Sequence, residues 1–126
     1  MAREEFQYAV LQVVPRVERG ERFNVGVVVY CRRRKFLGAL TALDRGKLAA
    51  LDPGADAAEI ERHLESLVQA ASGSEHGGPN ARLDAQDRFG WLVAPSSTVI
   101  QPGPTHTGLT EDPEATLARL FDELVA

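Results

Sequence analysis

The first third of the chain alternates between apolar segments and short polar turns. Three segments, residues 8–14, 23–31 and 36–42, are rich in the β-branched and aromatic residues that favour strands. The connections between them are too short to contain a crossover helix, so neighbouring strands must run antiparallel. The pattern therefore predicts an antiparallel meander of three strands.

The second of these segments is apolar on both faces. Strand alternation predicts that one face carries Phe23, Val25, Val27, Val29 and Cys31. The other face carries Asn24, Gly26, Val28 and Tyr30. A strand of this kind is central in its sheet and covered on both sides. We expect helices over one face. The helices predicted below could leave the other face bare, so we expect a homodimer in which a second copy covers it.

Helical spacing replaces alternation after residue 43. Asp44 begins a short helix that Pro53 ends. Asp56 and Glu59 form a capping box before a longer amphipathic helix. A brief helix is predicted to follow from Asp84.

The C-terminal part of the chain combines one more strand with a strongly patterned helix. Residues 97–101 have strand character that ends at Pro102. The final helix begins with Asp112 as its N-cap and Pro113 at its first position. We therefore predict a single α+β domain over residues 1–126. Its antiparallel sheet has about four strands, a meander of three plus one later strand, and its helices pack mainly on one face.

The composition is typical of a globular protein. Of the 126 residues, 44% are hydrophobic and 25% charged. No apolar run approaches the roughly 20 residues that cross a bilayer, and the chain does not open like a signal peptide. The single cysteine, Cys31, permits no disulfide within the chain and is expected to be a small buried hydrophobe. We expect a soluble cytoplasmic protein that does not bind membranes.

The charge balance argues against a nucleic-acid partner. The net charge is -4, whereas nucleic-acid binding needs a positive field. The one dense basic run, Arg32 to Lys35, lies between two predicted strands, where charges keep a hairpin tip solvated. We therefore expect no nucleic-acid binding.

A polar stretch at residues 95–109 is the best candidate site. It gathers hydroxyls and a histidine where Pro102, Pro104 and Gly108 restrict the backbone, and a rigid loop holds side chains at low entropic cost. With the nearby arginine and the asparagine of the second strand, we predict one concave ligand-binding patch. Its residues are Asn24, Arg88, Ser97, Thr98, His106 and Thr107.

The chemistry of this patch has more than one interpretation. His106 could act as a general base, but a histidine that bonds a backbone carbonyl to hold its loop is the more frequent case. Asn24 and Gly26 could mark a bulge or a close backbone approach, or Asn24 could join the patch.

No known catalytic or cofactor motif is present. The three histidines lack partners at metal-ligand spacing, so no metal is expected. There is no Gly-x-Ser-x-Gly elbow and no glycine-rich phosphate loop, so no cofactor and no catalytic residue are assigned.

Three stretches together resemble a known bacterial family. They are residues 8–28, with Val-Glu-Arg-Gly-Glu before Asn-Val-Gly-Val, residues 88–92, and the His-Thr-Gly-Leu-Thr stretch before Asp112. The sequence resembles the family catalogued as domain of unknown function 3037. The resemblance implies a small bacterial protein, often encoded beside kinase-like proteins of the HipA type, and it implies no catalytic residue.

These observations lead to two functional expectations. The first is a non-enzymatic protein-binding or regulatory module, with a neighbouring kinase-like protein as its candidate partner. The alternative is a small-ligand-binding protein or an enzyme that uses a polar pocket around His106.

Overall fold

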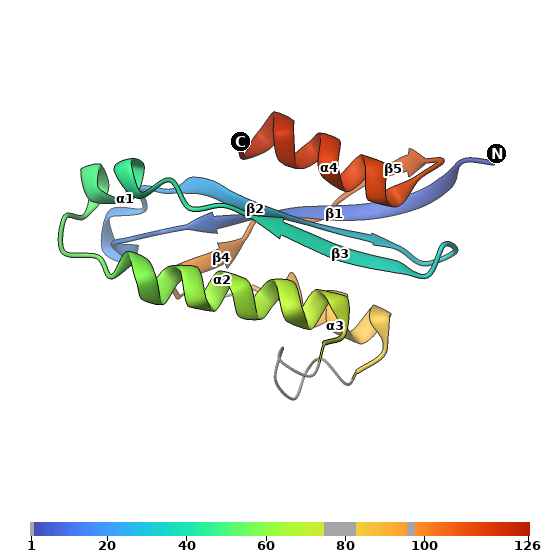
Figure 1. Cartoon of the computed structure of the whole chain (residues 1–126), viewed down its shortest axis with the longest axis horizontal. Coiled ribbons are helices and arrows are strands. Elements are labelled where there is room, and N and C mark those ends of the chain that lie inside the picture. Colours follow the sequence, from blue (N-terminus) through green and yellow to red (C-terminus); the bar gives the residue numbers. More distant parts are fainter. Residues whose placement is uncertain (1, 75–82, 96–97) are drawn as a thin grey trace.

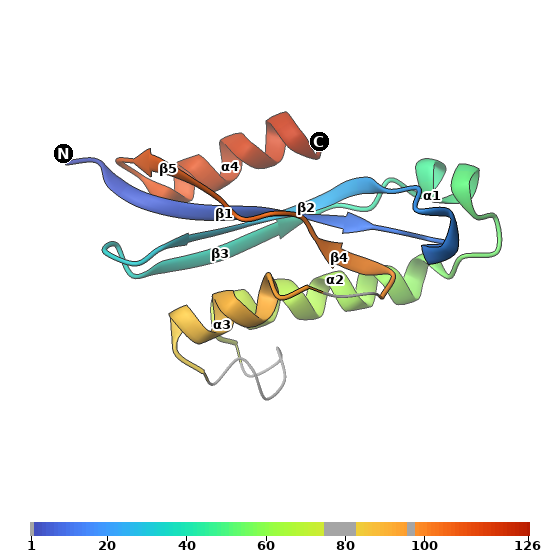
Figure 2. The ribbon, with the colours of Figure 1, turned by 180° about the vertical axis from the view of Figure 1, so that it is seen from behind.

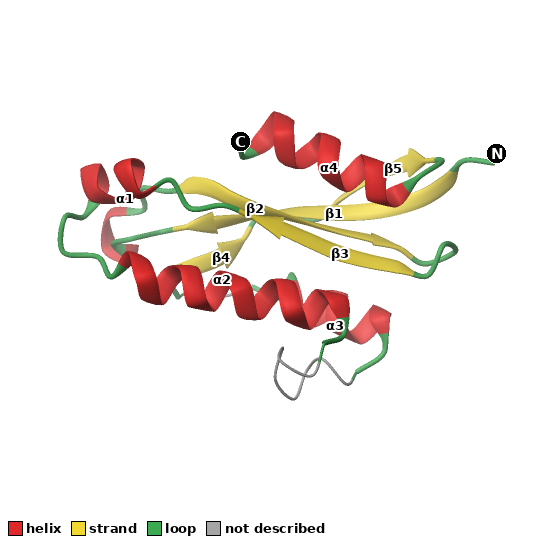
Figure 3. Ribbon diagram, in the orientation of Figure 1, coloured by secondary structure: helices red, strands yellow, loops and turns green. Residues whose placement is uncertain are grey.

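A computed structural model of the chain describes residues 2–74, 83–95 and 98–126. In chain order the elements are β1 (Glu4–Val13), a short 3₁₀ helix η1 (Val17–Arg19), β2 (Phe23–Cys31), β3 (Phe36–Thr41), α1 (Arg45–Leu51), α2 (Ala57–Ser72), α3 (Ala85–Leu92), β4 (Ile100–Pro102), β5 (His106–Thr110) and α4 (Pro113–Leu124). The strands form one antiparallel sheet, with helices on both of its faces (Figures 1 and 3). The predicted α+β class is confirmed.

The first three strands form the predicted meander. β2 lies between β1 and β3, with Val10 opposite Val27 and Val28 opposite Ala39. The register between β1 and β2 shifts at Leu11/Gln12, so that Val25 has no partner across the pair. This bulge lies beside Gly26, as a glycine within a strand predicts.

The second edge of β1 pairs with two short strands. β4 pairs with the end of β1 and β5 with its beginning, and between them the N–H of Gly103 donates to the carbonyl of Val10 at 2.8 Å. Figure 2 shows the chain crossing from β4, on the side of α2, to β5, on the side of α4. The predicted rigid loop around His106 is therefore wrong, because these residues are a fifth strand that pairs with β1.

Two separate hydrophobic clusters lie on the two faces of the sheet. Val28 and Tyr30 belong to the larger cluster, with side chains of α2 and α3. Val27, Val29 and Cys31 belong to the smaller one, under α4. Most of the helical cover lies on one face, as predicted, but α4 buries the other face within the same chain. That face does not require a second subunit, so the reasoning behind the predicted dimer is wrong. The dimer itself stays a prediction.

In the described residues, an aspartate begins each of the helices α1 to α4, as the sequence predicts. Each carboxylate accepts a hydrogen bond from the backbone N–H three residues later, an arrangement that satisfies an otherwise unpaired helix donor. The aspartates are Asp44, Asp56, Asp84 and Asp112. The caps fix where α2 and α4 start on opposite faces of the sheet.

Candidate functional site

Asn24 is a structural residue in this fold. Its side-chain oxygen accepts from Gln12 Nε2 at 3.1 Å, and its Nδ2 donates to the carbonyl of Leu124 at 3.0 Å. The amide thus ties β2 to β1 and to the C-terminal end of α4. Both ends of the amide are satisfied, which accounts for an asparagine in an apolar strand.

His106 and Thr107 are exposed residues at the start of β5. The ring centroid of His106 lies 5.1 Å from that of Tyr8, and Tyr8 packs against the cluster under α4. Strand alternation turns Thr107 to the opposite face of the sheet. The His106 side chain makes no hydrogen bond to a described residue, so the predicted bond to a backbone carbonyl is not seen there.

Arg88 and Thr98 lie on the other side of the sheet. Arg88 Nη1 donates to the carbonyl of Leu83 at 2.6 Å, and its guanidinium lies against Gly73 at the end of α2. The Thr98 hydroxyl donates to the carbonyl of Ile100 at 2.9 Å. Arg88 is thus on the side of α2 and α3, whereas His106 is on the side of α4. Ser97 lies outside the described residues.

The structure therefore does not bring the predicted patch together. The expected convergence fails because β4 and β5 distribute these residues along β1 and over two faces of the sheet. Ligand binding by any one of these residues stays a prediction.

A groove that the sequence did not predict runs between α2 and residues 98–100. One hollow of about 610 Å³ and a second of about 220 Å³ share His63, Thr98 and Ile100. Asp56 lines the larger hollow, and Trp91 the smaller one. The groove arises from packing between segments distant in the sequence, so the residues around His63 carry no local signal of it.

The outer edge of β3 has no strand partner among the described residues, since the sheet ends there. Its six residues, Phe36–Thr41, include no charged side chain and no proline, and Leu40 is 38% exposed. Proteins usually protect such edges with charges, prolines or short strands. The opposite edge has this protection, because β4 and β5 are short and Pro102 and Pro104 flank the break between them.

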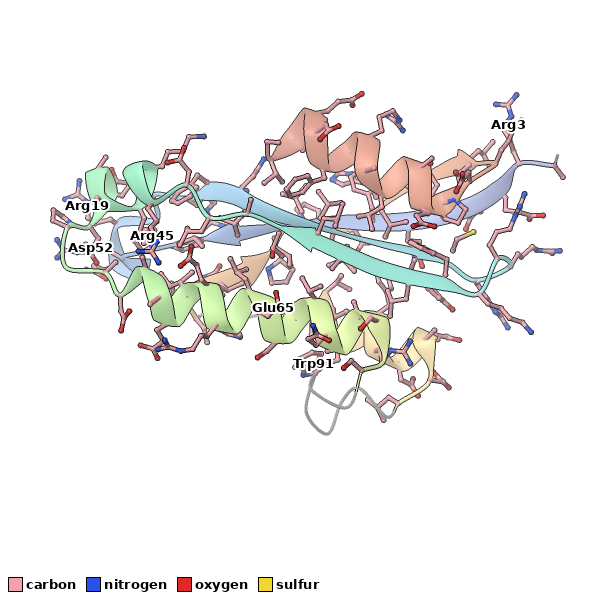
Figure 4. The ribbon with its side chains drawn as sticks, in the orientation of Figure 1. Arg3, Arg19, Arg45, Asp52, Glu65 and Trp91 are labelled. Carbon is pink, nitrogen blue, oxygen red and sulfur yellow. The ribbon has the colours of Figure 1, made fainter. Side chains whose placement is uncertain are left out.

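The two ends of the molecule differ in charge pairing. Arg19, Arg45 and Asp52 lie at the η1 end and Arg3 at the other (Figure 4). At the η1 end, Arg19 pairs with Glu21 at 2.7 Å and Arg45 pairs with Glu61. The hydrogen bond from Arg45 lowers the pKa of the Glu61 carboxyl.

The opposite end carries the basic tip, defined as Arg32, Arg33, Arg34 and Lys35. Within the described residues its one ion pair joins Arg33, whose side chain is 80% exposed, to Glu4 at 3.8 Å. Arg34 donates to the carbonyl of Ala2 at 2.7 Å, which places the start of the chain against the tip. Within the described part of the protein, Arg32, Arg34 and Lys35 therefore form no ion pair.

Two further classes of site are absent from the described part of the chain. No group of three histidine, cysteine or acidic side chains there is placed to hold a metal ion. None of the helices in those segments has the length and apolar character needed to cross a membrane.

Comparison with known proteins gives a family and no functional relative. No curated protein and no solved structure is significantly similar to the chain. The model of one family, described as "Protein of unknown function (DUF3037)", matches residues 8–125. Since this match covers nearly the whole sequence, the chain belongs to the DUF3037 family.

Proposed function

We propose that this protein is a non-enzymatic protein-binding module that adds an extended segment of a partner to the edge of β3. The observation that carries this proposal is an uncharged strand edge, free of proline and unpaired within the described residues. Added strands gain affinity from main-chain hydrogen bonds and specificity from alternate side chains. A kinase-like protein of the HipA type, suggested by the family resemblance, is the first partner to test.

The hydrogen-bond register supports an available edge. The N–H of Ala42 donates to the carbonyl of Val25 at 2.8 Å, and Leu40 and Gly38 lie opposite Val27 and Val29. Because hydrogen-bonded pairs alternate along an antiparallel ladder, the intervening residues direct their N–H and C=O groups away from β2. These residues are Leu37, Ala39 and Thr41.

A selection of short random peptides displayed on phage, followed by NMR of the complex, tests this proposal. We expect the selected peptides to protect the amides of Leu37, Ala39 and Thr41 from hydrogen exchange. Thr41→Pro removes an outward N–H without removing a sheet hydrogen bond, and should abolish binding.

Matched variants keep this test interpretable if Thr41→Pro unfolds. Leu40→Lys places a charge on the same edge and should weaken binding. Leu109→Lys makes the same change on β5, where Leu109 is 63% exposed, and should leave binding intact. Selected peptides that bind equally to all three folded variants, or a selection that yields no binder, would exclude the β3 edge.

The groove at His63 supports a second candidate function, small-ligand binding. Its larger hollow, of about 610 Å³, lies within the range of pockets that hold small molecules. An NMR screen of small aromatic and amine fragments should shift the signals of His63 and Trp91 together, and His63→Ala should remove the response. Shifts scattered outside the groove would argue against this function.

A further inference from the structure

The basic tip leads directly into the open edge of β3. The tip ends at Lys35, and β3 begins at Phe36. Arg32 and Lys35 form no ion pair within the described segments. A strand added to β3 would therefore have one end beside unpaired positive charge, which acidic side chains would complement.

Helices lie close over β3 on both faces of the sheet. On one face, a Cβ added to Gly38 would lie 3.1 Å from Cδ2 of Leu117, which shows how closely α4 approaches. On the other face, Ala39 is buried in one cluster with Leu67 and Ala71 of α2, and α2 packs on β3.

This helical cover is incompatible with a second copy paired at the same edge. Paired strands lie about 4.8 Å apart, whereas packed helices need about 8–10 Å between their axes. Two copies joined through β3 would bring their α2 helices, or α2 and α4, closer than this spacing allows. A bare extended segment brings no helix and avoids the conflict.

We propose that the occupant of the β3 edge is an extended, unstructured segment of a partner protein with acidic residues at its C-terminal end. The inference rests on the proposed function and names the chemistry of the partner. Every strand pair of the sheet is antiparallel. An antiparallel added strand ends beside the start of β3, so its C-terminal residues meet the basic tip.

Synthetic peptides of alternating valine and threonine test the inference. One peptide ends in two glutamates, a second begins with them, and a third ends in two lysines. We expect fluorescence anisotropy to show the tightest binding for the first, with affinity falling as salt rises.

The tip is tested with the triple variant Arg32→Gln, Arg33→Gln and Arg34→Gln. Exposed hairpin-tip charges contribute little to folding, so its melting temperature should stay near that of the unchanged protein. Its affinity for the first peptide should fall about tenfold. The matched control, Arg16→Gln, Arg19→Gln and Arg22→Gln, makes the same charge change at the η1 end and should bind as the unchanged protein does.

The outcomes separate this inference from the proposed function. If all three peptides bind the β3 edge equally and the tip variant binds as well as the control, the acidic partner is wrong while strand addition stands. If sedimentation shows a dimer that Leu40→Lys dissociates, the occupant is a second copy and the inference is overturned. If no peptide binds and the protein is monomeric, both proposals fail.

Discussion

Leu117→Ala is expected to lower the free energy of unfolding by about 3 kcal/mol, because a buried leucine truncated in a packed core leaves a cavity. Leu117 is 5% exposed and lies in the cluster that joins α4 to Val27 and Val29 of β2. Urea denaturation followed by circular dichroism measures the change.

Leu124→Ala is the matched control, since it makes the same change on the same helix. Leu124 is 37% exposed, so its truncation removes far less buried contact. We expect a loss below about 1 kcal/mol. Equal losses from both variants would mean that α4 does not bury the second face of the sheet.

Gly26→Ala is expected to destabilise the protein by about 2 kcal/mol through overpacking. An added Cβ would lie 2.9 Å from Cγ2 of Thr41, 3.0 Å from the carbonyl oxygen of Leu40 and 3.3 Å from Cδ1 of Leu11. The Leu40 oxygen belongs to the backbone of the adjacent strand and cannot rotate away. The whole β2–β3 pair would have to shift.

Gly90→Ala makes the same substitution in α3, where we expect it to stabilise the protein. Apart from its chain neighbours and the backbone of α3 itself, no atom of the described residues lies within 4 Å of a Cβ added at Gly90, which is inside α3. Alanine is the better helix former, so stability should rise by about 0.5–1 kcal/mol. If Gly26→Ala proved as harmless in the same urea assay, β2 and β3 would not approach as closely as described.

Local signals account for most of the fold that could be predicted. The aspartate caps at Asp44, Asp56, Asp84 and Asp112 act within one turn of chain, so each helix start can be found in the sequence alone. The meander follows from short connections between apolar segments. β5 was missed because His106–Thr110 has little apolar alternation, and its strand conformation depends on pairing with the distant β1.

The candidate site was less predictable than the fold. The prolines and the glycine around His106 drew attention to this stretch, but they do not determine which face of the sheet each side chain reaches. The register of β5 against β1, in which Tyr8 lies opposite His106, determines the face that each side chain reaches. The open edge of β3 likewise became visible only with the order of strands, because an edge is a property of the assembled sheet.

The late pairing of β1 has a consequence for the order of folding during synthesis. Glu4 pairs with Thr110, so β1 receives this neighbour only after all the elements between the two strands have been synthesised. Contacts between such distant residues raise the contact order and slow folding. In the interval, the nascent chain exposes a second unpaired edge on β1, where a strand of another nascent chain could bind in place of β5. Once β4 and β5 have paired with β1, the Pro102–Gly103–Pro104 break between them makes their outer edge a poor template for a further strand.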